Sequence, residues 1–436
     1  MDSNSHANHI ACFACFAGSL MRTAEIIAIG SELLGPSRVD TNSLWLTEKL
    51  GDIGVEVQLK TVVGDDKARL EEAVADAVKR ADVIITTGGL GPTEDDITRA
   101  CTANAIGREL VYHDEIEANL RERFKAWGRE MPEINKRQAF VVEGSEILEN
   151  PRGSAVGMLL EIGDKRVINL PGPPRENQPM FTELVLPRLK ALVGDVFITR
   201  REMKIVGLGE SAVDEVGAPI YTAYEGVQTS ILFNKTEVEL QIAVRRDSRA
   251  EADATADELT AKLSDAFGIA MFTTSGETME AVVGRLLSER GETVAFAESC
   301  TGGLVSRRIT EVPGSSAYFL EGLVAYSYPA KVRMLGVRQE TLDEFGAVSA
   351  ECAQEMAKGA VRVSGATHSV SITGIAGPDG GTDDKPVGTV YFAYSGPTGT
   401  RSIKLFLPGD RYLIRWRSSQ AALDILRRAL LRAVES

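Results

Sequence analysis

Short apolar runs alternate along the chain with segments in which apolar residues recur every three or four positions. The apolar run at 24–29 predicts a buried strand, and the segment 39–50 predicts a helix that begins in the polar sequence Asp40-Thr41-Asn42-Ser43. A strand, a helix and a strand are predicted next, at 55–63, 65–80 and 83–87. This repeated order predicts a mostly parallel sheet that helices cover on both faces.

The same order of elements returns in the last third of the chain. A predicted helix at 279–289 precedes an apolar run at 293–297, and the segment 326–331 is expected to be a turn. Further strands are predicted at 318–324, 369–372, 387–394 and 402–406, and further helices at 304–309, 349–363 and 411–433. Between the two parts, strands are predicted at 203–206, 230–233 and 237–244, with an acidic, alanine-rich helix at 248–267.

These patterns predict an α/β protein in which two three-layer α/β/α domains are joined by a small α+β connector domain. The length of 436 residues agrees with two or three domains, each large enough to bury its own core. The expected order is a disordered or spurious tail at 1–20, a first α/β/α domain at 21–194, the connector at 195–274 and a second α/β/α domain at 275–436.

Composition narrows the kinds of partner that the chain binds. Its formal net charge of −14 repels phosphate polymers, whereas general nucleic-acid binding needs a basic surface. The five cysteines are an odd number, so a disulfide framework is not expected. The sequence contains no apolar run long enough to span a membrane. We therefore expect a cytoplasmic protein that acts on small molecules, with neither a nucleic acid nor a membrane as partner.

Three loops follow the predicted strands of the first domain, and the carboxyl ends of parallel strands gather at one edge of a sheet. The loops are Gly30-Ser31-Glu32, Gly64-Asp65-Asp66 and the segment from Gly88 to Asp96. Acidic turns at one edge predict a divalent cation that bridges to phosphate oxygens, with ligands expected from Asp65, Asp95 and Asp96. The alternative is that Asp40, Asp65 and Asp95 cap the helices that they precede.

In the last domain, the sequence Ala297-Glu298-Ser299-Cys300-Thr301-Gly302-Gly303 lies between a predicted strand and a predicted helix. The first backbone N–H groups of a helix lack partners within it, and the two glycines let a ligand approach the backbone closely. This turn therefore predicts an anion-binding site. Cys300 is a candidate nucleophile at a helix start, and its alternative role is that of a small buried side chain.

Ser316 and Lys331 flank the strand predicted at 318–324, with Tyr326 between that strand and the lysine. A serine hydroxyl is a weak nucleophile until a base takes its proton, and the chain has only four histidines. A lysine with a lowered pKa takes this role in Ser-Lys variants of the catalytic triad. We expect Ser316 and Lys331 to meet at one end of the strand. The alternative is that Ser316 caps a helix and Lys331 is a solvated surface charge.

The sequence Gly88-Gly89-Leu90-Gly91-Pro92-Thr93-x-Asp95-Asp96-x-Thr98 resembles the signature of the molybdopterin-binding-like domain at the start of CinA (competence/damage-inducible) proteins. Other blocks of the match are Gly30 to Leu34, Asp40 to Ser43, Val63 to Asp65, Asn135-x-x-Gln138-Ala139 and Leu170 to Pro174, and the match covers about 23–192. The resemblance implies cleavage of ADP-ribose with a divalent metal such as Mg²⁺, while related domains bind pterins instead. The implied nucleotide site comprises Glu32, Asn42, Asp65, Gly88, Gly89, Gly91, Thr93 and Asp96.

The last domain resembles the CinA C-terminal domain, the nicotinamide-nucleotide amidase family, over about 275–433. The matching blocks are 297–303, Pro313-Gly314-Ser315-Ser316, Tyr326-Ser327-x-x-Ala330-Lys331, 373–378 and 385–389. The resemblance implies hydrolysis of nicotinamide mononucleotide to nicotinate mononucleotide and ammonia without a cofactor, with Ser316 as nucleophile, Lys331 as base and Tyr326 as its partner. The expected substrate-binding residues are Ser299, Thr301, Gly302, Gly303, Thr373, Gly374, Arg411 and Arg415. Tyr328 stands where this family often has asparagine, which leaves the local shape of the pocket open.

The connector occupies the place of a KH-type module in CinA proteins. Its sequence Gly207-Leu208-Gly209-Glu210 lacks the basic neighbours of an RNA-clamping loop, so we expect a structural spacer or a dimer element in a homodimer. One alternative for the whole chain is a pterin- or nucleotide-binding scaffold whose C-terminal site has decayed, which the intact Ser316, Tyr326 and Lys331 set opposes. Another is a DNA-uptake partner, which the acidic balance disfavours.

Overall fold

The structure is a computed structural model that describes residues 22–194 and 196–432, so the expected tail at 1–20 lies outside the described residues. Contacts divide the chain into two compact units. The first unit comprises residues up to 198 together with 245–252, and the second comprises 199–244 and 253–436. Over its described length, the chain has no helix that is both long and apolar enough to cross a membrane.

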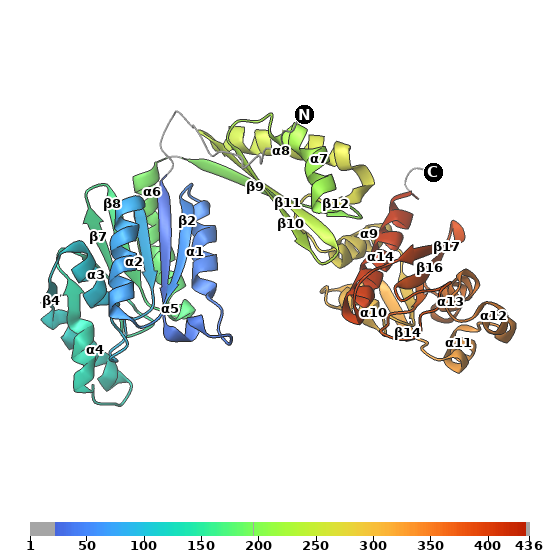
Figure 1. The fold of residues 1–436 in the computed structure, drawn as a ribbon, viewed down its shortest axis with the longest axis horizontal. Coiled ribbons are helices and arrows are strands. Elements are labelled where there is room, and N and C mark those ends of the chain that lie inside the picture. The colour runs from blue at the N-terminus through green and yellow to red at the C-terminus, as the bar shows by residue number, and fades with distance from the viewer. Residues whose placement is uncertain (1–21, 195, 433–436) are drawn as a thin grey trace, which may run out of the picture. The chain divides into compact units, whose positions relative to one another are not determined.

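A six-stranded sheet forms the centre of the first unit (Figure 1). In spatial order its strands are β2 (Glu56–Val63), β1 (Thr23–Ile29), β3 (Val83–Thr87), β8 (Lys165–Leu170), β7 (Gly157–Ile162) and β6 (Glu146–Leu148). The strands from β2 to β8 pair in parallel, so their carboxyl ends lie at one edge. A separate two-stranded sheet joins β4 (Leu110–Tyr112) to β5 (Phe140–Val142).

Alternate residues of the central strands point to opposite faces of this sheet, and each face has its own apolar core. Ile26 of β1 packs in the core that contains Leu46 and Phe181, whereas Ile27 packs in the core that contains Leu70. The first core is covered by α1 (Thr41–Gly51), α5 (Pro174–Met180), the π-helix η3 (Phe181–Val185) and α6 (Leu186–Val193). The second is covered by α2 (Lys67–Arg80), α3 (Thr98–Ile106) and α4 (Asp114–Ala126). Two 3₁₀ helices, η1 (Ser31–Leu34) and η2 (Glu133–Ala139), lie in the loops.

The connector contains a four-stranded sheet in the order β10 (Val227–Asn234), β11 (Glu237–Arg246), β9 (Phe197–Val206) and β12 (Met271–Thr273). Residues along β11 alternate between buried and half-exposed, so one face of the strand packs on a core and the other does not. The core contains Leu240 of β11 and Leu259 of α8. The helices here are α7 (Glu210–Tyr221), α8 (Arg249–Phe267) and the short η4 (Gly268–Ala270).

The remaining chain forms a five-stranded sheet in the order β14 (Phe319–Val324), β13 (Val294–Glu298), β15 (His368–Gly374), β16 (Thr389–Gly396) and β17 (Gly399–Phe406). β13 pairs in parallel with β14 and β15, and the last two strands are antiparallel. The core on one face includes residues of α9 (Met279–Arg290), α10 (Leu304–Thr310) and α14 (Arg411–Arg432). The core on the other includes residues of α11 (Tyr328–Leu335), α12 (Gln339–Phe345) and α13 (Ala350–Ser364). The predicted fold class, with two α/β/α domains and a small α+β domain, is confirmed.

Two local expectations are corrected. The segment 326–331 is not simply a turn, because α11 begins at Tyr328; the Ser327 hydroxyl caps it by accepting from the Ala330 N–H. Helix α7 was not expected from the sequence. Gly217 and Pro219 interrupt its apolar pattern, and both are weak helix formers.

We predict that Gly359→Ala destabilises the second unit. Gly359 lies in α13, where an added Cβ would be 2.0 Å from the backbone oxygen of Leu335, at the end of α11. Forcing the two helices apart is expected to cost about 1–3 kcal/mol. Hydrogen exchange measured by mass spectrometry would show faster exchange in α13.

Gly217→Ala is the matched control, because its added Cβ would lie 3.2 Å from a side-chain atom of Tyr221. That contact can relax, and alanine is the better helix former, so exchange is expected to stay the same or slow down. Equal exchange in Gly359→Ala and the unchanged protein would contradict the prediction.

Candidate active site at the edge of the second α/β/α sheet

The carboxyl ends of β13, β14 and β15 meet at one edge of the five-stranded sheet because the three strands are parallel. Ser299 follows β13 directly, and its backbone N–H donates to the carbonyl of Ile372 in β15 at 2.9 Å. β17 ends at Phe406, which pairs with Thr389 at this same edge, so α14 begins there too. The sheet topology therefore gathers residues from five separate parts of the chain at one edge.

Lys331 is the buried centre of this edge. Its side chain comes from α11 and the residue is 1% exposed. Lys331 Nζ lies 2.9 Å from Ser299 Oγ, 2.7 Å from the carbonyl oxygen of Ala325 and 3.2 Å from that of Tyr326. Among the residues that the structure describes, no carboxylate forms a salt bridge with this amine. Ser299 and Lys331 thus form a pair, whereas the sequence predicted that Lys331 pairs with Ser316.

Burial shifts the Lys331 amine towards its neutral form. Burial lowers the pKa of the Lys331 amine, because an ammonium ion loses its hydration there. A carbonyl oxygen only accepts hydrogen bonds, so two N–H groups of the amine are committed to Ala325 and Tyr326. In the neutral amine, the remaining position is the lone pair, and it faces the Ser299 hydroxyl. This geometry suits proton transfer from Ser299 to Lys331.

The predicted meeting of Ser316 and Lys331 is wrong. Ser316 lies in the 3₁₀ helix η5 (Ser315–Ala317), before β14, whereas Lys331 follows β14. The Tyr318 carbonyl accepts from Val294 at the start of β13, so Ser316 belongs to the opposite edge of the sheet. A strand of 6 residues separates the two edges by about 20 Å. Ser316 is exposed there.

The direction of the parallel strands identifies Ser299 as the serine that lies beside Lys331. In a parallel sheet the residue that follows one strand lies near the residues that follow its neighbours, and Ser299 and Lys331 both follow strands. Ser316 precedes one. Ser299, expected only as a substrate-binding group, therefore occupies the position expected of the nucleophile.

Tyr326 contacts Lys331 through its backbone and not through its phenol. The residue is 59% exposed, and the phenol oxygen accepts from Arg411 at 3.3 Å. Arg411 also donates to the Gly377 carbonyl at 2.8 Å, and Arg415 donates to the Thr301 carbonyl at 2.6 Å. The expected partnership of the Tyr326 side chain with the lysine is thus corrected, while the first turns of α14 bring two arginines to the same edge.

The first turn of α10 is not an open anion site. Glu298 at the end of β13 is fully buried, and its carboxylate accepts from the backbone N–H groups of Val305 and Ser306 and from the Ser306 hydroxyl, at 3.2, 2.9 and 2.7 Å. The carboxylate takes the place that the sequence pattern suggested for a ligand. Gly302 and Gly303 have φ values of 60° and 89°, so they are needed to form the turn itself.

The other predicted groups of this site differ in their roles. Burial raises the pKa of Cys300 to about 12, so its thiol stays protonated and is a poor nucleophile. Thr301 is fully buried, and its hydroxyl oxygen has no hydrogen-bond partner within the described chain. The Thr373 hydroxyl donates to the Ala347 carbonyl at 2.7 Å, and Gly374 ends β15 against β16.

The first unit has a cavity of about 440 Å³ at the carboxyl edge of its sheet, lined in part by Glu32, Asp40, Asn42, Thr87 and Gly172. The Asn42 amide donates to Thr87 Oγ1 at 2.9 Å and to the Gly172 carbonyl at 2.7 Å, while its Oδ1 is buried and has no partner among the described residues. Two of the predicted nucleotide-site residues, Glu32 and Asn42, therefore line one cavity.

Most acidic residues at this edge accept hydrogen bonds from residues of the loops or cap the helices that follow. Asp65 accepts from the Ser31 N–H at 3.0 Å, and Asp96 accepts from both the N–H and the hydroxyl of Thr93. Asp40 caps α1, as the alternative reading had it, and α2 is capped by Asp66. Gly88, Gly89 and Gly91 pack so closely that a Cβ would lie within 2.4 Å of neighbouring oxygens.

The predicted metal ligands do not form a three-residue cluster. Over residues 22–194 and 196–432, no three His, Cys, Asp or Glu side chains come together in a way that suits a metal ion. Asp95 is exposed, and the Asp65 and Asp96 carboxylates are engaged by Ser31 and Thr93. The three expected ligands are thus not assembled into a site of three protein ligands, and the divalent cation stays a prediction.

Three family models match successive parts of the chain. A model described as a probable molybdopterin binding domain matches residues 25–191, and one described as the damage-inducible protein CinA KH domain matches 200–273. The model of the CinA C-terminal domain matches 276–430. The edge that holds Ser299 and Lys331 lies within this last match.

Curated relatives match along almost the whole chain. A CinA-like protein of Koribacter versatilis is 45% identical over 412 residues, which cover 94% of this chain and 100% of the relative. A CinA-like protein of Solibacter usitatus is 45% identical over 407 residues, 93% of this chain and 98% of that protein. The crystal structure of a competence/damage inducible protein from Agrobacterium tumefaciens has 42% identity, covers 35% of this chain and 94% of that one, and gives a TM-score of 0.34.

We predict that Lys331 loses its proton at lower pH than an ordinary lysine. Because burial lowers its pKa, its amine is expected to titrate below the usual value of about 10.4. NMR titration of isotope-labelled lysine side chains measures this directly, and Lys331→Met identifies the signal by removing it. A titration midpoint at or above the ordinary value would contradict the prediction.

Proposed function

Because this chain belongs to the CinA family, we propose that its C-terminal domain is an amidase that hydrolyses nicotinamide mononucleotide to nicotinate mononucleotide and ammonia. Ser299 is the proposed nucleophile and Lys331 the proposed base. The observation that carries this proposal is the 2.9 Å contact between Ser299 Oγ and the buried Lys331 Nζ, whose two other contacts are carbonyl oxygens. The match to the CinA C-terminal domain supports the assignment of the reaction to this edge.

In the first step, Ser299 Oγ forms a bond to the carbon of the carboxamide while its proton passes to Lys331 Nζ. The carbonyl oxygen becomes an oxyanion. Its proposed donors are backbone N–H groups of the turn 300–303, in which the Gly302 N–H already donates to the Ser299 carbonyl at 3.1 Å. One such donor typically stabilises an oxyanion by about 3–4 kcal/mol.

In the second step, the C–N bond breaks and Lys331 returns the proton to the departing nitrogen, which leaves as ammonia. Water then attacks the acyl–serine ester, and its proton passes through Lys331 back to Ser299 Oγ. The products are the original serine and neutral amine and a carboxylic acid, which gives its proton to ammonia in solution and becomes the carboxylate. The reaction needs no redox partner, and a single base serves both halves.

The phosphate of the substrate is the proposed ligand of Arg411 and Arg415. Each guanidinium has five N–H donors, and the contacts with Gly377, Tyr326 and Thr301 use only some of them. Guanidinium groups bind phosphate through paired, charge-assisted hydrogen bonds. These arginines hold the nucleotide end of the substrate while Ser299 meets its amide end.

We predict that Ser299→Ala lowers kcat for ammonia release from nicotinamide mononucleotide by at least about a thousandfold, because the attacking oxygen is lost. Lys331→Arg is expected to be as severe, since a guanidinium stays protonated and cannot accept the proton of Ser299. In the unchanged enzyme, kcat/KM should rise as pH increases through the lowered Lys331 pKa, because only the neutral amine accepts a proton. Coupled detection of ammonia measures each quantity.

Ser316→Ala is the control for this prediction. Ser316 is an exposed serine of the same domain at the opposite edge of the sheet, so its loss should leave kcat within about twofold. Full activity of Ser299→Ala together with inactivity of Ser316→Ala would reject the assignment. Inactivity of the unchanged protein towards pyridine nucleotides would reject the reaction itself.

For the first unit, we propose a nucleotide site that takes ADP-ribose. The observation in its favour is the buried, unpartnered Asn42 Oδ1 beside a cavity of about 440 Å³, which offers an acceptor for a ribose hydroxyl or an adenine amine. Pyrophosphate cleavage with Mg²⁺ stays a prediction, and no step is assigned to a metal because the aspartates do not form a site for it.

We predict that Asn42→Ala weakens ADP-ribose binding by at least about tenfold, because a buried hydrogen-bond acceptor is lost. Isothermal titration calorimetry with ADP-ribose, with and without Mg²⁺, measures this. Asn169→Ala is the matched control, since Asn169 also donates to two threonine hydroxyls, those of Thr86 in β3 and Thr102 in α3, but does not line the cavity. Equal losses in the two variants would show a general effect on the fold and would overturn the proposal.

A further inference from the structure

The β10–β11 hairpin of the connector holds a strained residue at its tip. Lys235 has a φ of 54°, a region that suits glycine or asparagine better than lysine. Its ammonium lies 4.3 Å from the ring centre of Trp416 and 6.0 Å from that of Tyr412, both in α14. A cation over an indole ring is attracted to it. The lysine at this turn is therefore accounted for by its contact with α14 and not by the turn.

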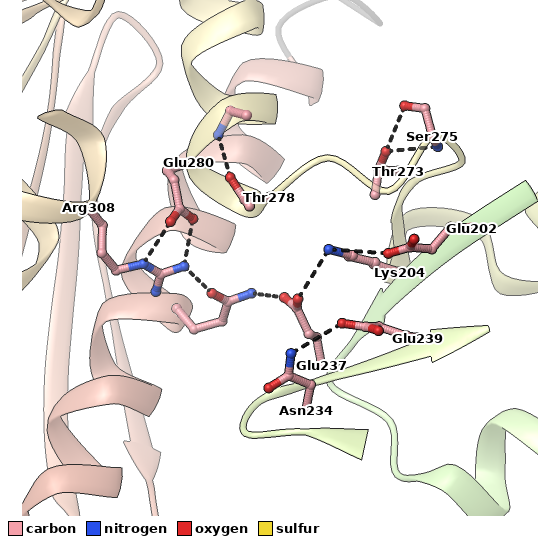
Figure 2. Close-up of polar contacts among 12 residues, drawn as sticks. Glu202, Lys204, Asn234, Glu237, Glu239, Thr273, Ser275, Thr278, Glu280 and Arg308 are labelled. Atoms are coloured by element: carbon pink, nitrogen blue, oxygen red, sulfur yellow. Dashed lines mark hydrogen bonds and ion pairs between the residues drawn. The ribbon is translucent and has the colours of Figure 1, made fainter. Parts of the chain in front are cut away.

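A second contact joins the hairpin to α14 two residues further on. Glu237 Oε2 accepts from Gln420 Nε2 at 3.0 Å, and Gln420 Oε1 accepts from Arg308 of α10 at 2.6 Å. Figure 2 shows Arg308 and Glu237 converging from different elements, with Lys204 of β9 on the far side of Glu237. Lys204 Nζ lies 3.9 Å from the Glu237 carboxylate. The hairpin, α14 and α10 are thus linked by one polar chain.

This series of polar contacts is buried, and Arg308, the cation at its centre, is well paired. Gln420 and Arg308 are 2% and 4% exposed. Arg308 donates to Glu280 at 2.8 Å and to Ser419 at 2.8 Å, and its guanidinium lies 4.8 Å from the ring centre of Trp416. Burial raises the pKa of Glu237, and Lys204 and Arg308 partly offset this effect. Hydrogen bonds in such surroundings are costly to break, so they fix the relative place of their elements.

The helices joined here are the ones that carry the candidate active site. Helix α14 begins at Arg411 and also carries Arg415. Trp416 follows Arg415 directly, and Gln420 lies about one helical turn after Trp416. In α10, Arg308 lies one turn beyond Leu304, which follows the turn after Ser299. Arg415 of α14 also contacts the turn before α10, because it donates to the Thr301 carbonyl.

We propose that the β10–β11 hairpin is a positioning element of the amidase site, in which Lys235 and Glu237 set the place of α14 and thereby of Arg411 and Arg415. This inference rests on the proposed amidase function. Lys235 and Glu237 touch neither substrate nor reacting atoms, so they act on substrate binding through the helix. The connector is then part of the machinery for binding the phosphate of the substrate.

The test uses the full chain with Lys235→Gly, Glu237→Ala and Glu237→Gln. Glycine relieves the strained φ, so Lys235→Gly is expected to keep or raise stability while it removes the contact with Trp416. In Lys235→Gly and Glu237→Ala we expect KM for nicotinamide mononucleotide to rise about fivefold, with kcat within about twofold. Glu237→Gln keeps an oxygen that accepts from Gln420 and should restore most of the affinity.

Glu239→Ala is the matched control. Glu239 lies on the same half-exposed face of β11 and accepts from Asn234 at 3.2 Å, both within the hairpin (Figure 2). Its KM should not change. An unchanged KM in both Lys235→Gly and Glu237→Ala, or an equal rise in Glu239→Ala, would overturn the proposal.

A second measurement separates this proposal from the amidase assignment. Hydrogen exchange over 411–417 and 299–303 should speed up in Lys235→Gly and Glu237→Ala and stay unchanged in Glu239→Ala, whether or not ammonia is released. If the unchanged protein releases no ammonia, the proposed function fails while the exchange data still test the link. If ammonia is released but exchange at 411–417 is the same in all variants, the positioning role fails alone.

Discussion

Burying the amine of Lys331 is the constraint on which the candidate active site depends. An amine removed from water is destabilised unless its N–H groups find acceptors, and a protonated amine is destabilised further. The carbonyls of Ala325 and Tyr326 satisfy two N–H groups without offering a negative charge. A carboxylate in their place would have stabilised the ammonium and removed the base. The choice of neutral acceptors leaves the lone pair for Ser299, so the local backbone decides the chemistry of the side chain.

The strand and helix order allowed much of the fold to be predicted, because apolar periodicity reports directly on which residues are buried. The same order contained the rule that places Ser299 beside Lys331, since both follow parallel strands. The expected meeting of Ser316 with Lys331 rested on their flanking one strand and did not consider that the two residues lie at opposite ends of it. Chain distance favoured Ser316, but β14 lies between it and the lysine. Strand direction is thus a stronger guide to a site than proximity in sequence.

Other features of the site depend on contacts that no local pattern reveals. The turn after β13 has the composition of an anion site, yet Glu298 supplies the carboxylate for α10 from within the fold. An acidic residue at the end of an apolar strand does not show in sequence which way its side chain turns. The phenol of Tyr326 likewise turns to Arg411, a residue 85 positions away. Such outcomes follow from tertiary packing, which decides between equally reasonable local partners.

The link between the connector and α14 shows how a buried charge extends a site beyond its own domain. Arg308 is 4% exposed, and an unpaired guanidinium in its place would cost several kcal/mol. Glu280, Ser419 and Gln420 meet this need, but Gln420 is itself oriented by Glu237, 183 positions earlier in the chain. The pairing of Arg308 in α10 thus depends on Gln420 in α14 and, through it, on Glu237 in the hairpin. Because α10 follows the turn after Ser299 and α14 carries Arg411 and Arg415, the pairing of this buried cation also bears on the place of the two arginines proposed to bind the substrate.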